Sequence, residues 1–346
     1  MKVMKVQLLK RTFLSNQTQL ISQKIVQWYL DNGRHDLPWR QKVTPYRIWI
    51  SEIMLQQTQV KTATPYFKSF IKKYPTQKKL SRASEDQILA LWSGLGFYSR
   101  ARNIFKTKEI IKEKYNNKFP KEFHQLLELP GIGKSTAGAI MSLGYRNPHP
   151  ILDGNVKRVI TRLVNQNLNL IKERELWKLS SQFVNKDNCF AYTQGIMDLG
   201  ATICTPTNPS CKDCPVQNQC ASAFNVTINK NKRVAKLKKI IPMNLSLIQT
   251  KDSLLLVKNE DSSIWKNLWI PFETRSLKNY AGVFKLTSSQ EIQHELTHRV
   301  LNINLNTYLS ESESKINTNK KYKWIKKDRI DQYGLPKPIS KVINEL

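Results

Sequence analysis

Apolar residues recur at helical spacing through the first two-thirds of the chain. After Ser15, a residue type that often caps helices, Ile21, Ile25 and Tyr29 fall on one face of a predicted helix. Pro45 suits the first turn of the next helix, because the backbone N–H that proline lacks has no partner there. No strand-like alternation of comparable strength occurs before residue 240. The pattern predicts an all-helical domain over residues 1–226.

Polar residues and glycines divide this helical region into segments. Ser84 and Gln87 have the spacing of a capping box, and Gly94 and Gly96 are expected to end the helix that follows. Apolar residues between positions 101 and 111 predict another helix, which ends before Pro120.

The pattern changes after residue 226. Residues 227–240 hold many lysines and few apolar residues, and they are predicted to be a basic linker that follows a phosphate backbone. Beyond them, short runs of β-forming residues alternate with polar turns, as in SLLLVKN and VFKLTS. A last helix is predicted near Pro338. Residues 241–346 are therefore expected to form a separate α+β domain.

The charge of the chain indicates its partner. The 346 residues carry 56 Lys and Arg against 26 Asp and Glu, a net charge of +30. This excess favours a polyanion, with nucleic acid first and an anionic membrane surface second. No apolar run approaches the roughly 18 residues that indicate a membrane span, and residues 1–14 lack the cleavage pattern of a targeting signal. We expect a cytoplasmic protein that does not bind membranes.

Four of the five cysteines lie close together in the sequence. Cys204, Cys211, Cys214 and Cys220 are separated by six, two and five residues, whereas Cys189 stands apart and is expected in the core. Clustered cysteines in an intracellular protein indicate a metal site more than disulfides. A structural zinc site more often has two CxxC pairs, although zinc remains an alternative.

The sequence LPGIGKSTAGAI, residues 129–140, predicts a tight turn between two helices. Gly131 and Gly133 allow a sharp turn and a close approach of the backbone to a ligand. The free N–H groups that begin the second helix favour an anion such as a phosphate. A glycine turn is often only a turn, but LPGxGxxTA with small residues after it is a narrower pattern.

Two acidic residues lie among apolar neighbours. Glu52 has Ile50 and Ile53 beside it, and burial there would hold a proton on its carboxyl group near neutral pH. Asp153 follows Leu152. The structural alternatives are a solvent-facing position for Glu52 and a helix cap for Asp153.

Together these motifs resemble the adenine DNA glycosylase family of the helix–hairpin–helix superfamily. The resemblance covers residues 37–220 and rests on LPWR, TPYRIWISEIMLQQTQV, GLGFYSRARN, LPGIGKSTAGAI and LDGNVKR. It implies a mainly α fold, a two-part helical helix–hairpin–helix glycosylase with a four-cysteine iron–sulfur loop (204–220), followed by an α+β Nudix-like domain. One 4Fe-4S cluster is the implied cofactor.

The resemblance also implies roles for individual residues. Glu52 matches the acid that protonates the adenine leaving group, Asp153 the carboxylate that stabilises positive charge at the sugar C1′, and Asn155 a residue that positions them or the water. Tyr98 resembles the aromatic wedge that intercalates beside the oxidised guanine. The residues expected to contact DNA or its bases are Trp39, Arg40, Gln56, Gln57, Thr58, Tyr98, Gly131, Gly133, Lys134, Ser135 and Lys157.

One position separates two chemistries. Related enzymes that also cut the strand carry a lysine nucleophile where this chain has Ser135, and an alcohol cannot form a Schiff base with the sugar. Lys134 is expected to face phosphate, and Lys157 is a candidate for weak, adventitious strand cleavage. The resemblance therefore implies a monofunctional glycosylase.

The C-terminal residues resemble the Nudix-like domain of the same family. Leu296, Thr297 and His298 stand where the family often has Phe-Ser-His in the loop that senses 8-oxoguanine, so an aliphatic residue replaces the aromatic one. The glutamate-rich helix of working Nudix hydrolases has no counterpart after Trp265, which disfavours nucleotide hydrolysis.

The expected activity is hydrolysis of the N-glycosidic bond of adenine opposite 8-oxoguanine or guanine in double-stranded DNA, by a monomer. Three alternatives remain open: a thymine-glycol glycosylase with lyase activity, a non-catalytic DNA-binding or redox-sensing iron–sulfur protein, and a nucleotide hydrolase. Ser135 argues against the lyase, and the pair Glu52 and Asp153 argues against a protein without catalysis. The missing glutamates argue against the nucleotide hydrolase.

Overall fold

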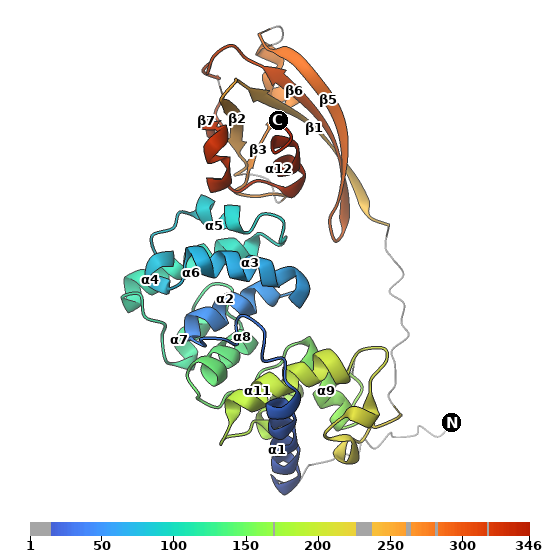
Figure 1. Cartoon of the computed structure of the whole chain (residues 1–346). Helices are drawn as coiled ribbons and strands as arrows, with labels where there is room; N and C mark the ends of the chain where they lie inside the picture. Colours follow the sequence, from blue (N-terminus) through green and yellow to red (C-terminus); the bar gives the residue numbers. More distant parts are fainter. Residues whose placement is uncertain (1–14, 169, 226–236, 261–263, 281–282, 317) are drawn as a thin grey trace, which may run out of the picture. The chain divides into compact units, whose positions relative to one another are not determined.

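The computed structural model describes residues 15–168, 170–225, 237–260, 264–280, 283–316 and 318–346 (Figure 1). The chain divides into two compact units, Met1–Ile71 with Thr107–Lys230, and Lys72–Lys106 with Asn231–Leu346. The second unit therefore contains a helical segment that the sequence pattern placed with the first. The domain limits 1–226 and 241–346 follow the chain and stay a prediction.

The first unit is helical, as the periodicity predicts. Its helices are α1 (Ser15–Asn32), α2 (Pro45–Leu55), most of α3 (Val60–Lys73), the last part of α6 (Ser99–Tyr115), α7 (Phe123–Leu127), α8 (Lys134–Ala139), η1 (Ile140–Gly144), α9 (Gly154–Leu163), α10 (Glu173–Phe183), α11 (Cys189–Asp198), η2 (Leu199–Ile203), η3 (Cys211–Asp213) and η4 (Gln217–Gln219). In the described part of the chain, no helix is both long and apolar enough to pass through a bilayer.

Helix α2 begins where the sequence predicts. The Thr44 hydroxyl accepts a hydrogen bond from the Arg47 N–H at 3.2 Å, and Pro45 occupies the first turn. Most of the helix is buried, and Trp49 packs against Phe119 with ring centroids 5.2 Å apart. A helix that is apolar on nearly all sides must lie inside the unit, which places its few polar residues in the interior.

The second unit combines short helices with a mixed sheet. Its elements are α4 (Gln77–Leu80), α5 (Glu85–Leu91), the start of α6, β1 (Lys239–Gln249), β2 (Ser253–Lys258), β3 (Trp269–Ile270), β4 (Phe272–Glu273), η5 (Thr274–Tyr280), β5 (Lys285–Glu295), β6 (Arg299–Leu309), β7 (Tyr322–Lys326), η6 (Lys327–Gln332) and α12 (Lys337–Ile343). Helix α5 has the predicted capping box between Ser84 and Gln87.

The sheet has the order β3-β2-β1-β6-β5, with β4 paired to β1 and β7 paired to β2. Strands β1 and β6 are parallel along their whole length, and β5 and β6 form an antiparallel hairpin. The hairpin turn is closed by the hydrogen bond from Leu296 N–H to Arg299 O at 2.8 Å. Leu301, Ile303 and Leu305 of β6 are buried, so the hairpin is anchored by one apolar face.

The predicted linker lies mostly outside the described residues. Its last two positions, Lys239 and Ile240, already belong to β1, so the strand begins earlier than predicted. They pair with Arg299 and Val300 of β6, and this backbone pairing extends the strand into the basic segment.

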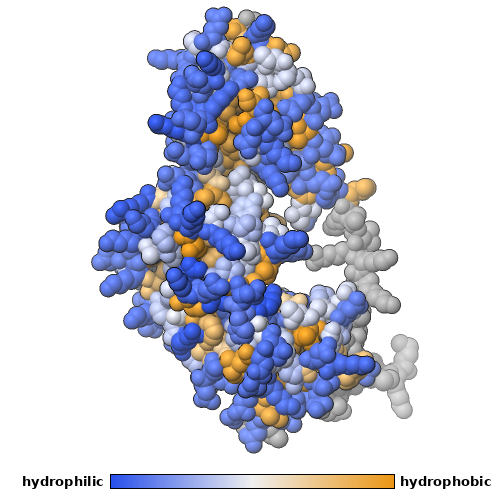
Figure 2. Space-filling view, viewed as in Figure 1, coloured by the Kyte–Doolittle hydropathy of each residue, from blue (hydrophilic) through white to orange (hydrophobic). Residues whose placement is uncertain are grey.

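The face drawn in Figure 2 is largely hydrophilic, with apolar residues in small separate groups.

Candidate active site

A cavity of about 430 Å³ lies in the first unit, within the roughly 300–1,000 Å³ range of ligand pockets. It is formed by α2 and the residues after it, the segment before α2, α8, the start of α9, and α11 with η2. Its polar lining residues are Arg34, Trp39, Arg40, Ser51, Glu52, Gln56, Thr58, Gln59, Ser135, Thr136, Asp153, Asn155 and Gln194. Residues more than 140 positions apart in the sequence thus share one cavity.

Glu52 is the one carboxylate that α2 brings to this cavity. Burial and, to a smaller extent, the negative charge of Asp153 raise the pKa of Glu52 to about 8, while Arg40 opposes the rise. Its carboxyl group is therefore protonated at neutral pH, which agrees with the expectation from its apolar neighbours. A protonated carboxyl group in a cavity is suited to donate a proton to a bound molecule.

Asp153 lines the same cavity and also caps α9. Its Oδ1 accepts a hydrogen bond from the Val156 N–H at 2.7 Å. Burial raises the pKa of Asp153, and the backbone N–H groups of Val156 and Asn155 and the charge of Arg158 offset this rise only in part. The cap that the sequence offered as an alternative is present, and it places the carboxylate in the cavity.

Asn155 lines the cavity from the first turn of α9. Its Oδ1 accepts a hydrogen bond from Arg158 Nη2 at 2.8 Å, and the same nitrogen bonds to Gly200 O at 2.5 Å. A Cβ atom at Gly200 would lie 2.6 Å from the Asn155 Cβ, so only glycine allows η2 to approach this closely. Asn155 is thereby fixed between α9 and η2.

Asp198 at the end of α11 holds two arginines beside the cavity. Its carboxylate accepts hydrogen bonds from Arg34 Nη2 at 2.5 Å and from Arg40 Nη1 at 2.6 Å. Burial alone would raise the pKa of Asp198, but the bonds and charges of Arg40 and Arg34 lower it. Trp39 is also buried at the cavity, against Phe67 with ring centroids 5.5 Å apart.

Among the residues at the cavity that were not predicted from the sequence are Arg34 and Gln194, which line it, and Asp198, which binds Arg34 and Arg40. Asp198 sits between apolar residues of α11, the same signal that drew attention to Glu52, so it could have been found. Gln194 is buried on the same helix and carried a weaker form of this signal. Nothing in the sequence marks Arg34 as a functional residue, because it is one of 56 basic residues.

The predicted DNA contacts divide into two groups. Trp39, Arg40, Gln56, Thr58 and Ser135 line the cavity. Gln57, Gly131, Gly133, Lys134 and Lys157 do not line it. Gln57 is exposed and has a φ of 55°, and Lys157 Nζ lies 3.5 Å from Glu173 Oε1.

The helix–hairpin–helix turn forms between α7 and α8. Gly131 has a φ of 81°, the left-handed conformation that favours glycine. Gly133 has an ordinary conformation and precedes α8, and a Cβ atom there would meet nothing within 4 Å. Its lack of a side chain leaves open space at the start of the helix.

Comparison with known proteins decides the family. The model of the helix–hairpin–helix (HhH-GPD) superfamily base excision DNA repair protein matches residues 50–184, and the NUDIX domain model matches residues 244–345. An adenine DNA glycosylase of Buchnera aphidicola subsp. Baizongia pistaciae is 40% identical over 346 residues, covering 95% of this chain and 97% of the relative. The chain belongs to the adenine DNA glycosylase family. The expected enzyme class, a DNA glycosylase of base excision repair, is confirmed.

More distant members of the family match shorter parts of the chain. The adenine DNA glycosylase of Homo sapiens is 37% identical over 215 residues, which are 58% of this chain and 39% of that protein. Among solved structures, a thermostable thymine-DNA glycosylase superposes with a TM-score of 0.56 and 26% identity over 61% of this chain and 98% of its own. The predicted helical glycosylase fold and the Nudix-like second part are thereby confirmed.

The second unit of this adenine DNA glycosylase family member contains a cavity of about 720 Å³, which we call the hairpin cavity. It is formed by the turn before α6, the loop before β3, the β5–β6 hairpin and the start of α12. Its lining residues are Gly94, Gly96, Phe97, Tyr98, Ser99, Arg102, Ile264, Trp265, Lys266, His294, Glu295, Leu296, Thr297, His298, Arg299 and Lys337. Four predicted contact residues, Tyr98 and the three at the hairpin tip, therefore meet at one site.

Two aromatic residues stand next to each other at this cavity. Phe97 is 43% exposed and has a φ of 48°. Tyr98 is half-buried, and its hydroxyl lies 3.4 Å from Leu335 O, which also accepts a hydrogen bond from Ser93 Oγ at 2.9 Å. Phe97 is thus the more accessible aromatic side chain, whereas Tyr98 is held by the C-terminal residues.

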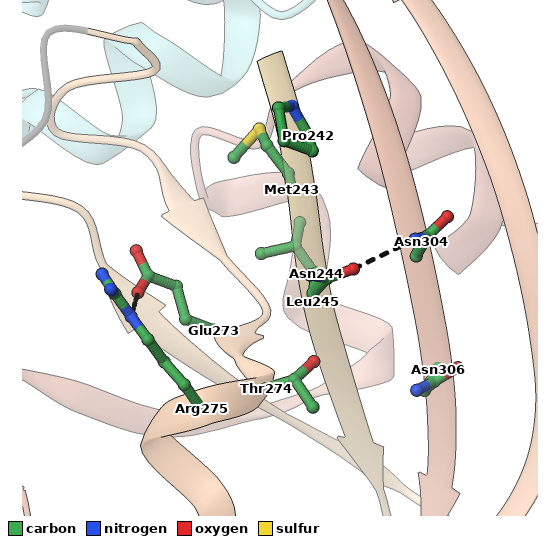
Figure 3. Close-up of a pocket in the computed structure, with 9 residues that line it drawn as sticks. All are labelled: Pro242, Met243, Asn244, Leu245, Glu273, Thr274, Arg275, Asn304 and Asn306. Atoms are coloured by element: carbon green, nitrogen blue, oxygen red, sulfur yellow. Dashed lines mark hydrogen bonds and ion pairs between the residues drawn. The ribbon is translucent and has the colours of Figure 1, made fainter.

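Another cavity, of about 550 Å³, lies on β1, β6 and the start of η5 (Figure 3). Among the residues that line it, Glu273 is the one carboxylate, and its Oε2 bonds to Arg275 Nε at 2.6 Å. Asn304 bonds to Asn244 at 3.0 Å on the other side (Figure 3). The polar groups of this cavity largely satisfy one another.

The four clustered cysteines are free thiols and half-buried. Burial raises the pKa of Cys214 to about 11, and the charges of the other three thiols raise it too, so the four lie near one another. Arg162 Nη1 lies 3.3 Å from Cys204 Sγ. In the described ranges, however, no three His, Cys, Asp or Glu side chains are arranged to hold a metal ion. Cys189 is buried, as expected for a core residue.

Proposed function

We propose that this protein hydrolyses the N-glycosidic bond of adenine opposite 8-oxoguanine or guanine in double-stranded DNA and leaves an abasic site. The observation that carries the proposal is the meeting of Glu52 and Asp153 in one cavity, with the pKa of Glu52 raised to about 8. Adenine is a poor leaving anion, so its departure requires a proton on the base and an anion near the sugar.

The two carboxyl groups divide these tasks. Glu52 carries a proton at neutral pH and donates it to a ring nitrogen of the flipped adenine. Asp153, held by the Val156 N–H, is the anion that stabilises positive charge at C1′ while water adds to that carbon and gives its proton to the Glu52 carboxylate. Asn155 positions the sugar or the water, and Trp39 and Arg40 form walls of the adenine site.

The absence of a lysine supports a monofunctional mechanism. Ser135 lines the cavity, and its hydroxyl accepts a hydrogen bond from the Leu152 N–H at 3.0 Å. No lysine is among the described residues that line the cavity, and Lys157 is paired with Glu173. Strand cleavage through a Schiff base requires such an amine.

Contacts with the DNA backbone follow from the charge and the hairpin. The net charge of +30 supplies a long-range attraction for phosphates. The turn with Gly131 and Gly133 leaves the backbone N–H groups at the start of α8 open to one phosphate, with Lys134 exposed beside them.

The base opposite adenine is the ligand of the hairpin cavity. Thr297 and His298 offer hydrogen-bonding groups at its edge, and an aromatic side chain enters the stack. Phe97 rather than Tyr98 is this wedge, because it is exposed and the Tyr98 hydroxyl is held at Leu335.

One 4Fe-4S cluster is the proposed cofactor, with Cys204, Cys211, Cys214 and Cys220 as its ligands. The support is their spacing and the influence of the four thiols on one another. A bound cluster would hold residues 204–220 folded by ligation of their thiolates. Iron and sulfide analysis with visible absorption tests this, and stoichiometric zinc would replace the proposal.

The test of activity uses duplexes that hold adenine opposite 8-oxoguanine, guanine or thymine, followed by gel analysis with and without alkali. We expect cleavage of the first, slower cleavage of the second and none of the third, with strand breaks only after alkali. No cleavage by an iron-loaded preparation would refute the proposal, and breaks without alkali would refute the monofunctional mechanism.

A further inference from the structure

Trp265 has an unusual backbone conformation at the hairpin cavity. Its φ is 59°, a region that bulky side chains rarely adopt. The side chain is only 6% exposed, lines the cavity, and lies against His294 with ring centroids 6.4 Å apart. Burial lowers the pKa of His294, and the charges of Lys337 and Lys341 lower it further, so this ring is neutral at neutral pH.

The loop that carries Trp265 is fixed from several sides. Asn259 Nδ2 donates to Ile264 O at 2.7 Å, and Arg102 Nη1 donates to Lys266 O at 3.0 Å. Asn267 Nδ2 donates to Glu85 Oε1 at 3.1 Å. A strained conformation persists only where its surroundings determine it, and such residues concentrate at functional sites.

The surroundings of Trp265 suit a nucleotide. Arg102, Lys266 and Lys337 line the cavity, and its one acid, Glu295, is paired with Lys238 at 2.6 Å. Positive groups around aromatic faces are what single bases and their phosphates require.

We propose that Trp265 is a recognition residue on whose ring the purine opposite adenine packs. The proposal rests on the proposed function of the hairpin cavity. The aromatic surface comes from the loop before β3, whereas the hairpin tip presents the aliphatic Leu296. His294 lies beside the indole at this cavity as an uncharged ring.

The test measures binding of the whole protein to duplexes whose adenosine carries a 2′-fluorine, which disfavours the C1′ cation and keeps the substrate intact. Opposite this adenosine stands 8-oxoguanine, guanine, or a tetrahydrofuran residue without a base. Trp265→Leu is expected to weaken binding to the two purine duplexes by about five- to a hundredfold, the range for loss of one stacked base. Binding to the duplex without the base is expected to stay within about threefold.

Trp324→Leu is the matched control, because Trp324 is half-buried on β7 and does not line the cavity. Equal losses on all three duplexes would show a structural role and overturn the proposal, as would no loss at all. If Trp265→Leu unfolds, Trp265→Phe provides the test. The 8-oxoguanine duplex should quench the tryptophan fluorescence of the natural protein, and this quenching should be smaller in Trp265→Phe. Unchanged quenching would overturn the proposal. Failure of the proposed function can be told apart from failure of this proposal, since in that case the natural protein would cleave no mispair.

Discussion

Replacing Glu52 by glutamine is expected to stabilise the folded protein while it removes activity. Burial raises the pKa of Glu52 from 4.5 to about 8, so folding at neutral pH must neutralise a carboxylate that is charged in the unfolded chain. One pKa unit corresponds to about 1.4 kcal/mol, which makes this cost on the order of 3 kcal/mol at pH 7. Water that enters the cavity reduces it, and we expect a gain of about 1–3 kcal/mol in the variant.

The stability difference between Glu52→Gln and the natural protein should increase with pH. Because the pKa of Glu52 is raised in the folded state, its protonation supports folding fully below pH 4.5, and this support is lost as pH rises to about 8. The melting temperature of Glu52→Gln should therefore exceed that of the natural protein by little at about pH 5 and by about 2–10 °C at about pH 8.5. Thermal unfolding followed by circular dichroism measures this, with the exposed Glu128→Gln as control.

The same variant tests the chemistry. Loss of a general acid lowers the single-turnover rate by about 10²–10⁴-fold. In the natural protein the rate should fall as pH rises through about 8. A melting-temperature difference that does not change with pH would show that the pKa of Glu52 is not raised by folding. Retained turnover would show that Glu52 is not the general acid, and either result would refute the reasoning.

Asp153→Asn is expected to change the free energy of unfolding, measured in urea, by less than about 1 kcal/mol, because asparagine also caps helices. It should lower the single-turnover rate by at least about 10²-fold. A loss of stability as large as the loss of activity, in free energy, would show that Asp153 has a structural role. Ser135→Lys should become trapped on DNA by borohydride while the natural protein is not, and trapping of the natural protein would contradict the monofunctional mechanism. Phe97→Ala should weaken mispair binding by about five- to a hundredfold, whereas Tyr98→Phe loses one hydroxyl contact and should weaken it by less than about tenfold. A larger loss of binding in Tyr98→Phe than in Phe97→Ala would indicate that Tyr98 is the intercalating residue.

Local signals in the sequence predict the ends of individual helices well. The capping box of Ser84 and Gln87 and the proline at position 45 both act within one helical turn, and the structure has both. Such signals depend on hydrogen bonds between residues three positions apart, so the sequence contains all the information they need.

Contacts between distant segments could not be predicted in the same way. Asp198 and Arg34 are 164 residues apart, and nothing near either residue specifies its partner. The segment Lys72–Lys106 contacts the C-terminal residues partly through Asp86, which bonds to Lys258 and accepts a hydrogen bond from Trp269 Nε1 at 3.0 Å. Buried pairs of this kind form only once the chain is folded, because burial makes an unpartnered charge costly.

The two carboxyl groups that we propose as catalytic have different surroundings because they lie at different places on their helices. Both are half-buried, and desolvation raises the pKa of each. Asp153 precedes the first turn of α9, where free N–H groups point at its carboxylate and favour the charged form. Glu52 lies inside α2, where the backbone N–H groups are already bonded to carbonyls, and Arg40, which opposes its rise, is bound to Asp198. Hydrogen bonds at the cap thus lower the pKa of Asp153 against the effect of burial, whereas inside α2 the pKa of Glu52 is raised to about 8. An anion beside a protonated acid is the pairing that release of a neutral base requires.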